Sequence, residues 1–176
     1  MIIITRPLYL HKMQLTENNH SEFIGLEALK EAQAKQLKQL EEWAINNDWQ
    51  KFHVSHFDWW MFPFSKPSHF GYTYTVYESE ILALKQDPDF IKNYLRGVEL
   101  VLLSWGWNLY KEEMVAEPGL NQEWQNWPIR LYKCGMSLQE FEFDIEFDSV
   151  KKYANLILKQ CKNFEYMGID LAIIFR

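Results

Sequence analysis

The chain has 176 residues and a formal net charge of −6, with 48% apolar and 24% charged residues. This size and balance exclude an intrinsically disordered chain and predict one soluble, compact domain. The 18 Lys and Arg residues are scattered singly or in pairs, so we expect no nucleic acid among the partners.

Two short features bear on where the protein works. The N-terminal stretch MIIITRPLYLHK has only four consecutive apolar residues, too few for a signal peptide. No apolar stretch approaches the length of a membrane span, so we expect a cytoplasmic protein with no membrane partner. Cys134 and Cys161 fit neither a zinc-binding spacing nor a disulfide framework, so both are expected to be reduced and partly buried.

A first helix is predicted from Ser21 to Ile45, where apolar residues recur at three- and four-residue steps. The polar run Asn46-Asn47-Asp48 predicts its end, because these side chains compete for backbone hydrogen bonds. No internal repeat or low-complexity linker is present. We therefore expect an N-terminal extension over residues 1–20 and a single helical domain over residues 21–176.

Two further helices are predicted between residues 75 and 105. Thr75 and Glu78 have capping-box spacing, which predicts a helix whose inward residues are Ile81, Leu82 and Leu84. Asp87 and Pro88 read as an N-cap followed by proline at the first helical position. The apolar residues that follow predict a long central helix to about Trp105, with Gly106 as its stop.

Two patterns compete further along the chain. The sequence EFEFDIEF, residues 140–147, alternates as a half-buried strand does and predicts a short hairpin with residues 129–134. Ser137 and Glu140, however, have capping-box spacing, which indicates a helix. Glu117-Pro118-Gly119 predicts a loop before this region, and a last amphipathic helix is predicted from Ser149 to Lys162. The expected fold class is all-α: a multihelical orthogonal bundle with a short β-hairpin near residues 129–147.

The stretch SHFDWWMFPFSKPSHF, residues 55–70, is unusually aromatic. His56, Trp59 and Phe62 share a face at helical spacing, so we expect them in the core. Trp60 lies off that face, and we expect it to line a groove together with Phe64 and Phe70. The alternative is that the rings form an exposed platform for a ligand, a peptide or a base.

Metal-ligand chemistry is concentrated in the same region, in the side chains of His53, His56, Asp58 and His69. Neutral imidazoles and a carboxylate suit zinc or ferrous iron. No HExxH motif is present, and a histidine at a helix end more commonly caps carbonyl groups or packs its ring. We therefore expect no metal and no cofactor.

The acidic residues 140–146 and Cys134 can each be interpreted as a functional site or as part of the structure. On a strand, the carboxylates of residues 140–146 would share a face that binds a divalent cation, although a solvated face protecting a sheet edge is the commoner meaning. Cys134 could form a nucleophile pair with a distant histidine, but no local signature accompanies it.

The segment SHFDWWMFP, residues 55–63, resembles the SHWMWFxFP signature of an uncharacterised bacterial family of small multihelical proteins. It matches at five positions and departs at Phe57, Asp58 and Trp60. The similarity continues through TVYESEILALKQDPDFIKNYL and, with one inserted residue, through RLYKCGMSL. A second resemblance, to the conserved region of the opioid growth factor receptor family, rests on Trp43, Asp48-Trp49 and residues 60–63. The bacterial family implies an all-helical fold and no particular activity, cofactor or catalytic residue.

Two functions are consistent with these observations. The first is a non-catalytic binding or interaction domain whose aromatic groove takes a peptide, a protein or a small apolar ligand. Its candidate residues are Trp60, Phe64, His69 and Phe70, with His56 and Asp58 nearby. The alternative is a small enzyme, with or without a metal, that uses His56, Asp58 and His69. No catalytic residue can be assigned from the sequence.

Overall fold

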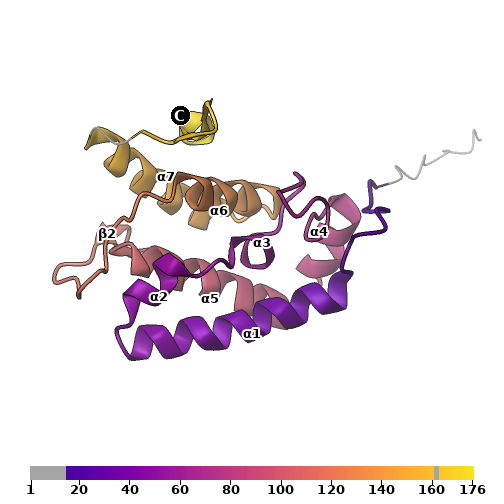
Figure 1. Cartoon of the computed structure of the whole chain (residues 1–176), viewed down its shortest axis with the longest axis horizontal. Coiled ribbons are helices and arrows are strands. Elements are labelled where there is room, and N and C mark those ends of the chain that lie inside the picture. The colour runs from indigo at the N-terminus through magenta and orange to yellow at the C-terminus, as the bar shows by residue number, and fades with distance from the viewer. Residues whose placement is uncertain (1–14, 161–162) are drawn as a thin grey trace, which may run out of the picture.

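The computed structural model describes residues 15–160 and 163–176 of the chain (Figure 1). Residues 1–14 of the predicted N-terminal extension and Cys161 lie outside these ranges. The described part is mainly helical, as predicted. Its elements are α1 (Leu26–Ile45), α2 (Trp49–Val54), α3 (Asp58–Met61), α4 (Glu78–Lys85), α5 (Pro88–Ser104), β1 (Trp107–Asn108), β2 (Glu113–Met114), α6 (Pro128–Glu140), α7 (Asp144–Lys159), β3 (Glu165–Tyr166), β4 (Ile169–Asp170) and the 3-10 helix η1 (Leu171–Phe175).

The longer helices form two packed pairs that α3 connects. Helix α1 packs along α5, and α6 packs on α7 (Figure 1). Helix α3 contacts α1, α5 and α6, so the DWWM segment lies between the two pairs. The strands form two separate antiparallel pairs, β1 with β2 and β3 with β4. None of the helices over the described residues has both the length and the apolar character that crossing a membrane requires.

Helix α1 follows the predicted periodicity but begins five residues later than Ser21. Gly25 has a φ of 86°, which lies outside the helical region, so the helix starts at Leu26. Its buried apolar residues are Leu29, Leu37 and Leu40. The polar run ends the helix as predicted, since Asn46 Nδ2 donates a hydrogen bond to the Glu42 carbonyl oxygen and Asn47 has a φ of 55°.

The predicted cap of α5 is confirmed. The Asp87 carboxylate accepts hydrogen bonds from the backbone N–H groups of Asp89 and Phe90, and Pro88 occupies the first helical position. Gly106, with a φ of 77°, follows the C-terminal end as predicted.

The predicted start of the preceding helix needs a correction. Helix α4 begins at Glu78, and Glu80, not Glu78, reaches back to the N–H of Tyr77 at 3.0 Å. The Glu78 carboxylate instead accepts a hydrogen bond from the N–H of Thr16. Leu82 is exposed rather than inward, because the face of α4 that packs on the protein carries Glu80 and Leu84.

The predicted hairpin over residues 129–147 is wrong, because its first strand is helical and its second spans the end of one helix, a turn and the start of the next. Residues 128–140 form α6 and residues 144–159 form α7, which also starts five residues before the predicted Ser149. The alternation has another origin: Phe141 and Phe143 flank a tight turn at Glu142, whose φ is 61°. Phe147 then lies one helical turn after Phe143. The alternating phenylalanines of the sequence therefore belong to a turn between two helices and not to a strand.

A stack of four rings, all buried except the half-buried Phe143, joins α5 to this turn. Tyr94 lies 5.1 Å from Phe141 and 5.7 Å from Phe143 between ring centroids, and Phe90 lies 6.1 Å from Tyr94. The Tyr94 hydroxyl donates to Ser137 Oγ, which donates to the carbonyl oxygen of Pro63. Burial raises the pKa of Tyr94 well above its ordinary value. The Tyr94 hydroxyl, which is the one polar side-chain group of this stack, thus has a hydrogen-bond partner in Ser137.

Candidate binding site

The aromatic stretch is not one continuous helix. Helix α2 ends at Val54, and Ser55 has extended backbone before α3 begins at Asp58. The break is stabilised by Arg130, whose two terminal nitrogens donate to the carbonyl oxygens of Phe52 at 2.8 Å and Ser55 at 2.6 Å. The helical end therefore has its free carbonyl groups satisfied by a guanidinium from α6.

This break overturns the predicted facing of the stretch. Phe62 is buried as predicted, but His56 is exposed and Trp59 is only half-buried. The buried residues of this stretch include Phe57, Asp58, Met61, Phe62 and Phe64. Helical spacing could not predict this because the extended residue rotates His56 away from the face of α3.

A tight loop brings further rings to α3. Ser68 and Gly71 exchange two backbone hydrogen bonds, at 3.1 and 2.9 Å, and Gly71 has a φ of 58°. The positive φ favours glycine at this position; a Cβ atom there would lie 2.8 Å from a carboxylate oxygen of Glu22, a flexible side chain that would have to shift. The loop is also held at Ser65, whose N–H and hydroxyl both donate to Glu140.

Seven rings are in contact and form what we call the aromatic face. Trp59 is central, with ring centroids 4.7 Å from Phe70, 5.0 Å from His69 and 6.1 Å from both Trp60 and His56. Tyr74 joins through Trp60 and Phe70, and Trp127 joins through His56. The members of the aromatic face are thus His56, Trp59, Trp60, His69, Phe70, Tyr74 and Trp127.

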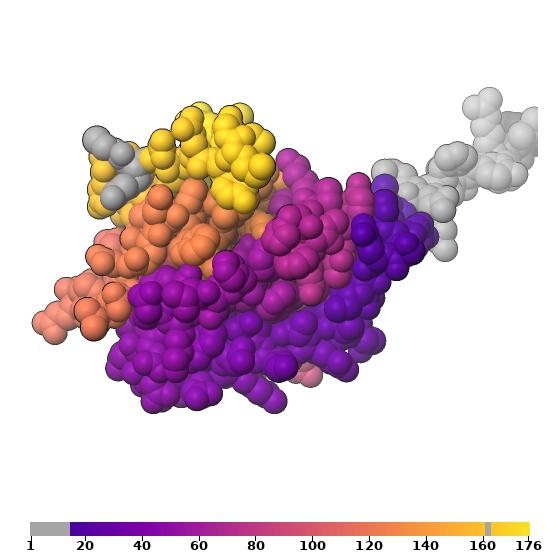
Figure 2. Space-filling model, in the orientation of Figure 1, coloured from indigo at the N-terminus to yellow at the C-terminus, as the bar shows by residue number. Residues whose placement is uncertain are grey.

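The aromatic face is partly open to solvent. Phe70 is 45% exposed, His56 and His69 are exposed, and the other four rings are half-buried. At one edge, Trp60 and Tyr74 line an open groove of about 310 Å³ against α1, whose contributing residues are Ala32, Lys35, Gln36 and Gln39. The segment from α2 to α4, purple to magenta in the space-filling view, lies at the surface on the side facing the viewer (Figure 2).

Three charged side chains are buried beneath the aromatic face. Lys133 Nζ lies 2.5 Å from Asp58 Oδ2, and Arg130 Nε lies 3.7 Å from Asp58 Oδ1. The exposed fractions are 6% for Asp58, 1% for Arg130 and 7% for Lys133. Both cations also contact rings of the face: Lys133 lies 4.6 Å from the centre of the Trp59 ring, and the Arg130 guanidinium lies 4.7 Å from that of Trp127.

Burial controls the electrostatics of this cluster. Desolvation lowers the pKa of Arg130 to about 10, and it lowers the pKa of Lys133 although the Asp58 carboxylate acts in the opposite direction. With both cations protonated, two positive charges face one negative charge. The buried cluster therefore carries a formal charge of +1.

The structure does not gather the four side chains with metal-ligand chemistry. His53 is buried, with Nε2 2.7 Å from the Asn121 carbonyl oxygen, and burial lowers its pKa. His56 lies against Trp59 and Trp127, His69 lies against Trp59 and Phe70, and Asp58 is engaged by Lys133. Over the described residues, no group of three or more His, Cys, Asp or Glu side chains could hold a metal ion.

The other residues that the sequence suggested for a functional site are buried in the fold or lie at helix ends. Phe64 is buried, with its ring 6.2 Å from that of Tyr132. Cys134 is fully buried, which raises the pKa of its thiol. The acidic residues of the predicted strand lie at the end of α6, in the turn and at the start of α7, where Glu142 forms an ion pair with Lys85.

Sequence reasoning missed Arg130, Lys133, Tyr74 and Trp127. Arg130 and Lys133 are three residues apart, so on a helix they lie on one face, but the segment had been assigned to a strand. Proline at position 128, the first residue of α6, was the signal for a helix start.

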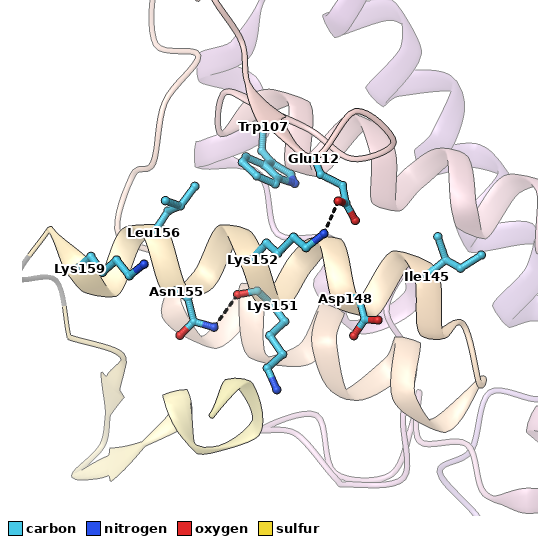
Figure 3. Close-up of a pocket in the computed structure, with 9 residues that line it drawn as sticks. All are labelled: Trp107, Glu112, Ile145, Asp148, Lys151, Lys152, Asn155, Leu156 and Lys159. Carbon is cyan, nitrogen blue, oxygen red and sulfur yellow. Dashed lines mark hydrogen bonds and ion pairs between the residues drawn. The ribbon is translucent and has the colours of Figure 1, made fainter.

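A second, larger groove lies between α7 and the β1–β2 hairpin, with a volume of about 690 Å³ (Figure 3). Lys152 points across it to form an ion pair with Glu112, and Trp107 forms part of its apolar wall. Trp107 is itself almost fully buried, and its indole N–H donates to Ser149 Oγ at 3.0 Å. This groove has one aromatic ring, whereas the aromatic face has seven.

The chain matches no protein-family model, no curated protein and no solved structure. The two resemblances at residues 55–63 and 43–63 therefore stay hypotheses, and the functional argument depends on the geometry of the site.

Proposed function

We propose that this protein is a non-catalytic helical binding domain, and that the aromatic face is its binding surface. The observation that carries the proposal is the continuous contact of seven rings, centred on Trp59, that is left partly open to solvent. Aromatic side chains bury a large area with little loss of conformational freedom, so such surfaces are typical of recognition sites.

The proposed ligand is a short peptide segment that places an apolar side chain in the groove beside Trp60. A groove of about 310 Å³ is at the low end for small-molecule sites and accommodates one large side chain. Its polar rim, formed by the exposed Lys35 and Gln39 on α1, offers hydrogen-bonding groups to a peptide backbone, and the buried Gln36 also lines the groove. An apolar floor with a polar rim is the usual composition of a peptide-binding groove.

The proposal includes two broader points. The helices are proposed to pack as an orthogonal bundle, with α3 between the two helix pairs. The protein is proposed to act in the cytoplasm, with neither nucleic acid nor membrane as a partner.

The enzyme alternative has less support. It requires His56 to cooperate with Asp58 or His69 in an open cavity. Asp58 instead lies in the buried cluster with Lys133, while the rings of His56 and His69 contact Trp59. No observation in the described part of the chain favours this alternative over binding.

Selection from a random peptide library tests the proposal, with Phe70→Ser and Tyr166→Ser as matched variants. Both side chains are 45% exposed, but Tyr166 lies on the β3–β4 hairpin and not on the aromatic face. We expect wild type to enrich peptides with a shared aromatic or aliphatic residue. Phe70→Ser should lose at least about 1.4 kcal/mol of binding free energy for these peptides, a tenfold weakening, whereas Tyr166→Ser should bind them as wild type does. No enrichment, or loss only in Tyr166→Ser, would contradict the proposal.

A further inference from the structure

A small cavity adjoins the buried charged cluster on the inner side of the aromatic face. Its volume is about 10 Å³, and it is partly enclosed by Trp59, Phe64, Lys66, Ser68 and Lys133, with other residues of the 62–75 segment. This volume accommodates about one water-sized atom. The cavity is therefore lined by two lysine side chains and by the central ring of the aromatic face.

One buried donor of a residue that lines this cavity has no acceptor among the described residues. The Trp59 indole N–H is buried and has no hydrogen-bond partner among these residues. Arg130 does not line the cavity; its buried Nε also has no hydrogen bond among the described residues and lies 3.7 Å from Asp58 Oδ1. The Lys133 ammonium carries three N–H groups and donates to Asp58. Buried donors of this kind normally have acceptors, so the site has capacity for one more.

The charges around the cavity also favour an anionic acceptor. Asp58 compensates only one of the two buried cations, and Lys66 adds a third positive group at the cavity edge, where its Nζ lies 3.3 Å from the Tyr132 hydroxyl. The nearby carboxylate of Glu140 is occupied by the N–H and hydroxyl of Ser65. An uncompensated charge is costly when buried, so an anion that enters this site is favoured.

We infer that the ligand of the aromatic face carries a carboxylate, and that one carboxylate oxygen enters the cavity between Trp59, Lys133 and Lys66. The inference rests on the proposed function, because it uses the same face. The cavity admits one anion oxygen, and the single negative charge of a carboxylate matches the formal charge of +1 on the buried cluster. The apolar part of the ligand then lies on the rings around Trp59.

Fluorine NMR titration with two matched probes tests this inference. 4-Fluorophenylacetate is ionised at pH 7, whereas 4-fluorophenylacetamide has the same ring and no charge. Wild type is expected to bind the acid about tenfold more tightly than the amide, because one buried charge-assisted hydrogen bond gives about this gain in affinity. Lys133→Met should abolish this preference, and Lys66→Met should reduce it about threefold.

The matched control is Lys35→Met, since Lys35 is an exposed lysine on the groove rim that does not line the cavity. It should keep the full preference for the acid. Circular dichroism establishes that each variant is folded. If Lys133→Met does not fold, the exposed Lys66→Met decides, and an unchanged preference in that variant overturns the inference.

The remaining outcomes separate the two proposals. Equal binding of acid and amide, both lost in Phe70→Ser, overturns the carboxylate inference and leaves the binding face supported. Binding of neither probe at millimolar concentration contradicts both. A preference for the acid that Lys35→Met alone removes places the anion on the groove rim and overturns the cavity site.

Discussion

Two of the aromatic clusters in this protein differ in what surrounds the rings. In the stack of Phe90, Tyr94, Phe141 and Phe143, all rings except the half-buried Phe143 are buried, and the single hydroxyl donates to Ser137. In the aromatic face, Phe70 is 45% exposed and the buried Trp59 N–H has no partner among the described residues. Aromatic content alone thus does not separate core from site, whereas coverage does; an unpartnered indole N–H does not, because the fully buried Trp105 has one too among the described residues.

The largest expected effect contrasts one ring from each region. Phe141 is fully buried, so Phe141→Ala should lower the free energy of unfolding by about 3 to 5 kcal/mol. Phe70→Ala should lower it by less than about 1 kcal/mol, because a half-exposed ring loses little burial. Urea denaturation measures both. Equal losses would show that the aromatic face is part of the core.

The buried charged cluster provides the next effect. Asp58→Asn leaves Lys133 and Arg130 without a counter-charge and should lower the free energy of unfolding by about 3 kcal/mol. The control is Glu142→Gln, which breaks an exposed ion pair with Lys85 and should cost less than about 1 kcal/mol. If Asp58→Asn leaves the urea midpoint unchanged, the cluster is not held by Asp58 and the argument for a buried positive charge fails.

A smaller effect distinguishes the two adjacent tryptophans. Trp59 contacts four rings and the Lys133 ammonium, whereas Trp60 contacts Trp59 and Tyr74. Trp59→Ala should therefore cost about 2 kcal/mol, roughly 1 kcal/mol more than Trp60→Ala. Thermal denaturation of both variants checks this order, and a reversed order would remove Trp59 from the centre of the face.

The smallest effect is a pH dependence at His53. Burial lowers the pKa of folded His53 below its ordinary 6.5, so between these two values the unfolded chain binds a proton that the folded chain does not. Stability should therefore fall as the pH decreases through this window. His53→Gln should show a shallower decline than wild type. Identical pH profiles for His53→Gln and wild type would contradict this assignment.

The sequence predicted the helices whose signals are local. Asp87 and Pro88 act within one turn of the chain, and the periodicity of α1 depends on no other segment. It mispredicted residues 129–147 because Phe141, Phe143 and Phe147 alternate across a turn between two helices. A period of two carries no information about the backbone when a residue with positive φ, here Glu142, interrupts it.

The candidate site could be predicted only in part. Trp60, His69 and Phe70 do lie on one surface, because they are close in sequence and a short loop joins them. The charged cluster could not be predicted, since Asp58 and Lys133 are 75 residues apart and meet through the packing of α3 on α6. The facing of His56 depended on the break at Ser55, which Arg130 stabilises from the same distant helix.

The most direct test of the central claim is a titration of the protein's eight indole N–H groups, observed in ¹H–¹⁵N correlation spectra, with the neutral probe 4-fluorophenylacetamide. If the aromatic face is the binding surface, the signals of Trp59 and Trp60 shift with a common saturation curve. The signal of Trp107, in the groove beside α7, stays in place. A shift of Trp107 without any shift of Trp59 and Trp60 would contradict the account.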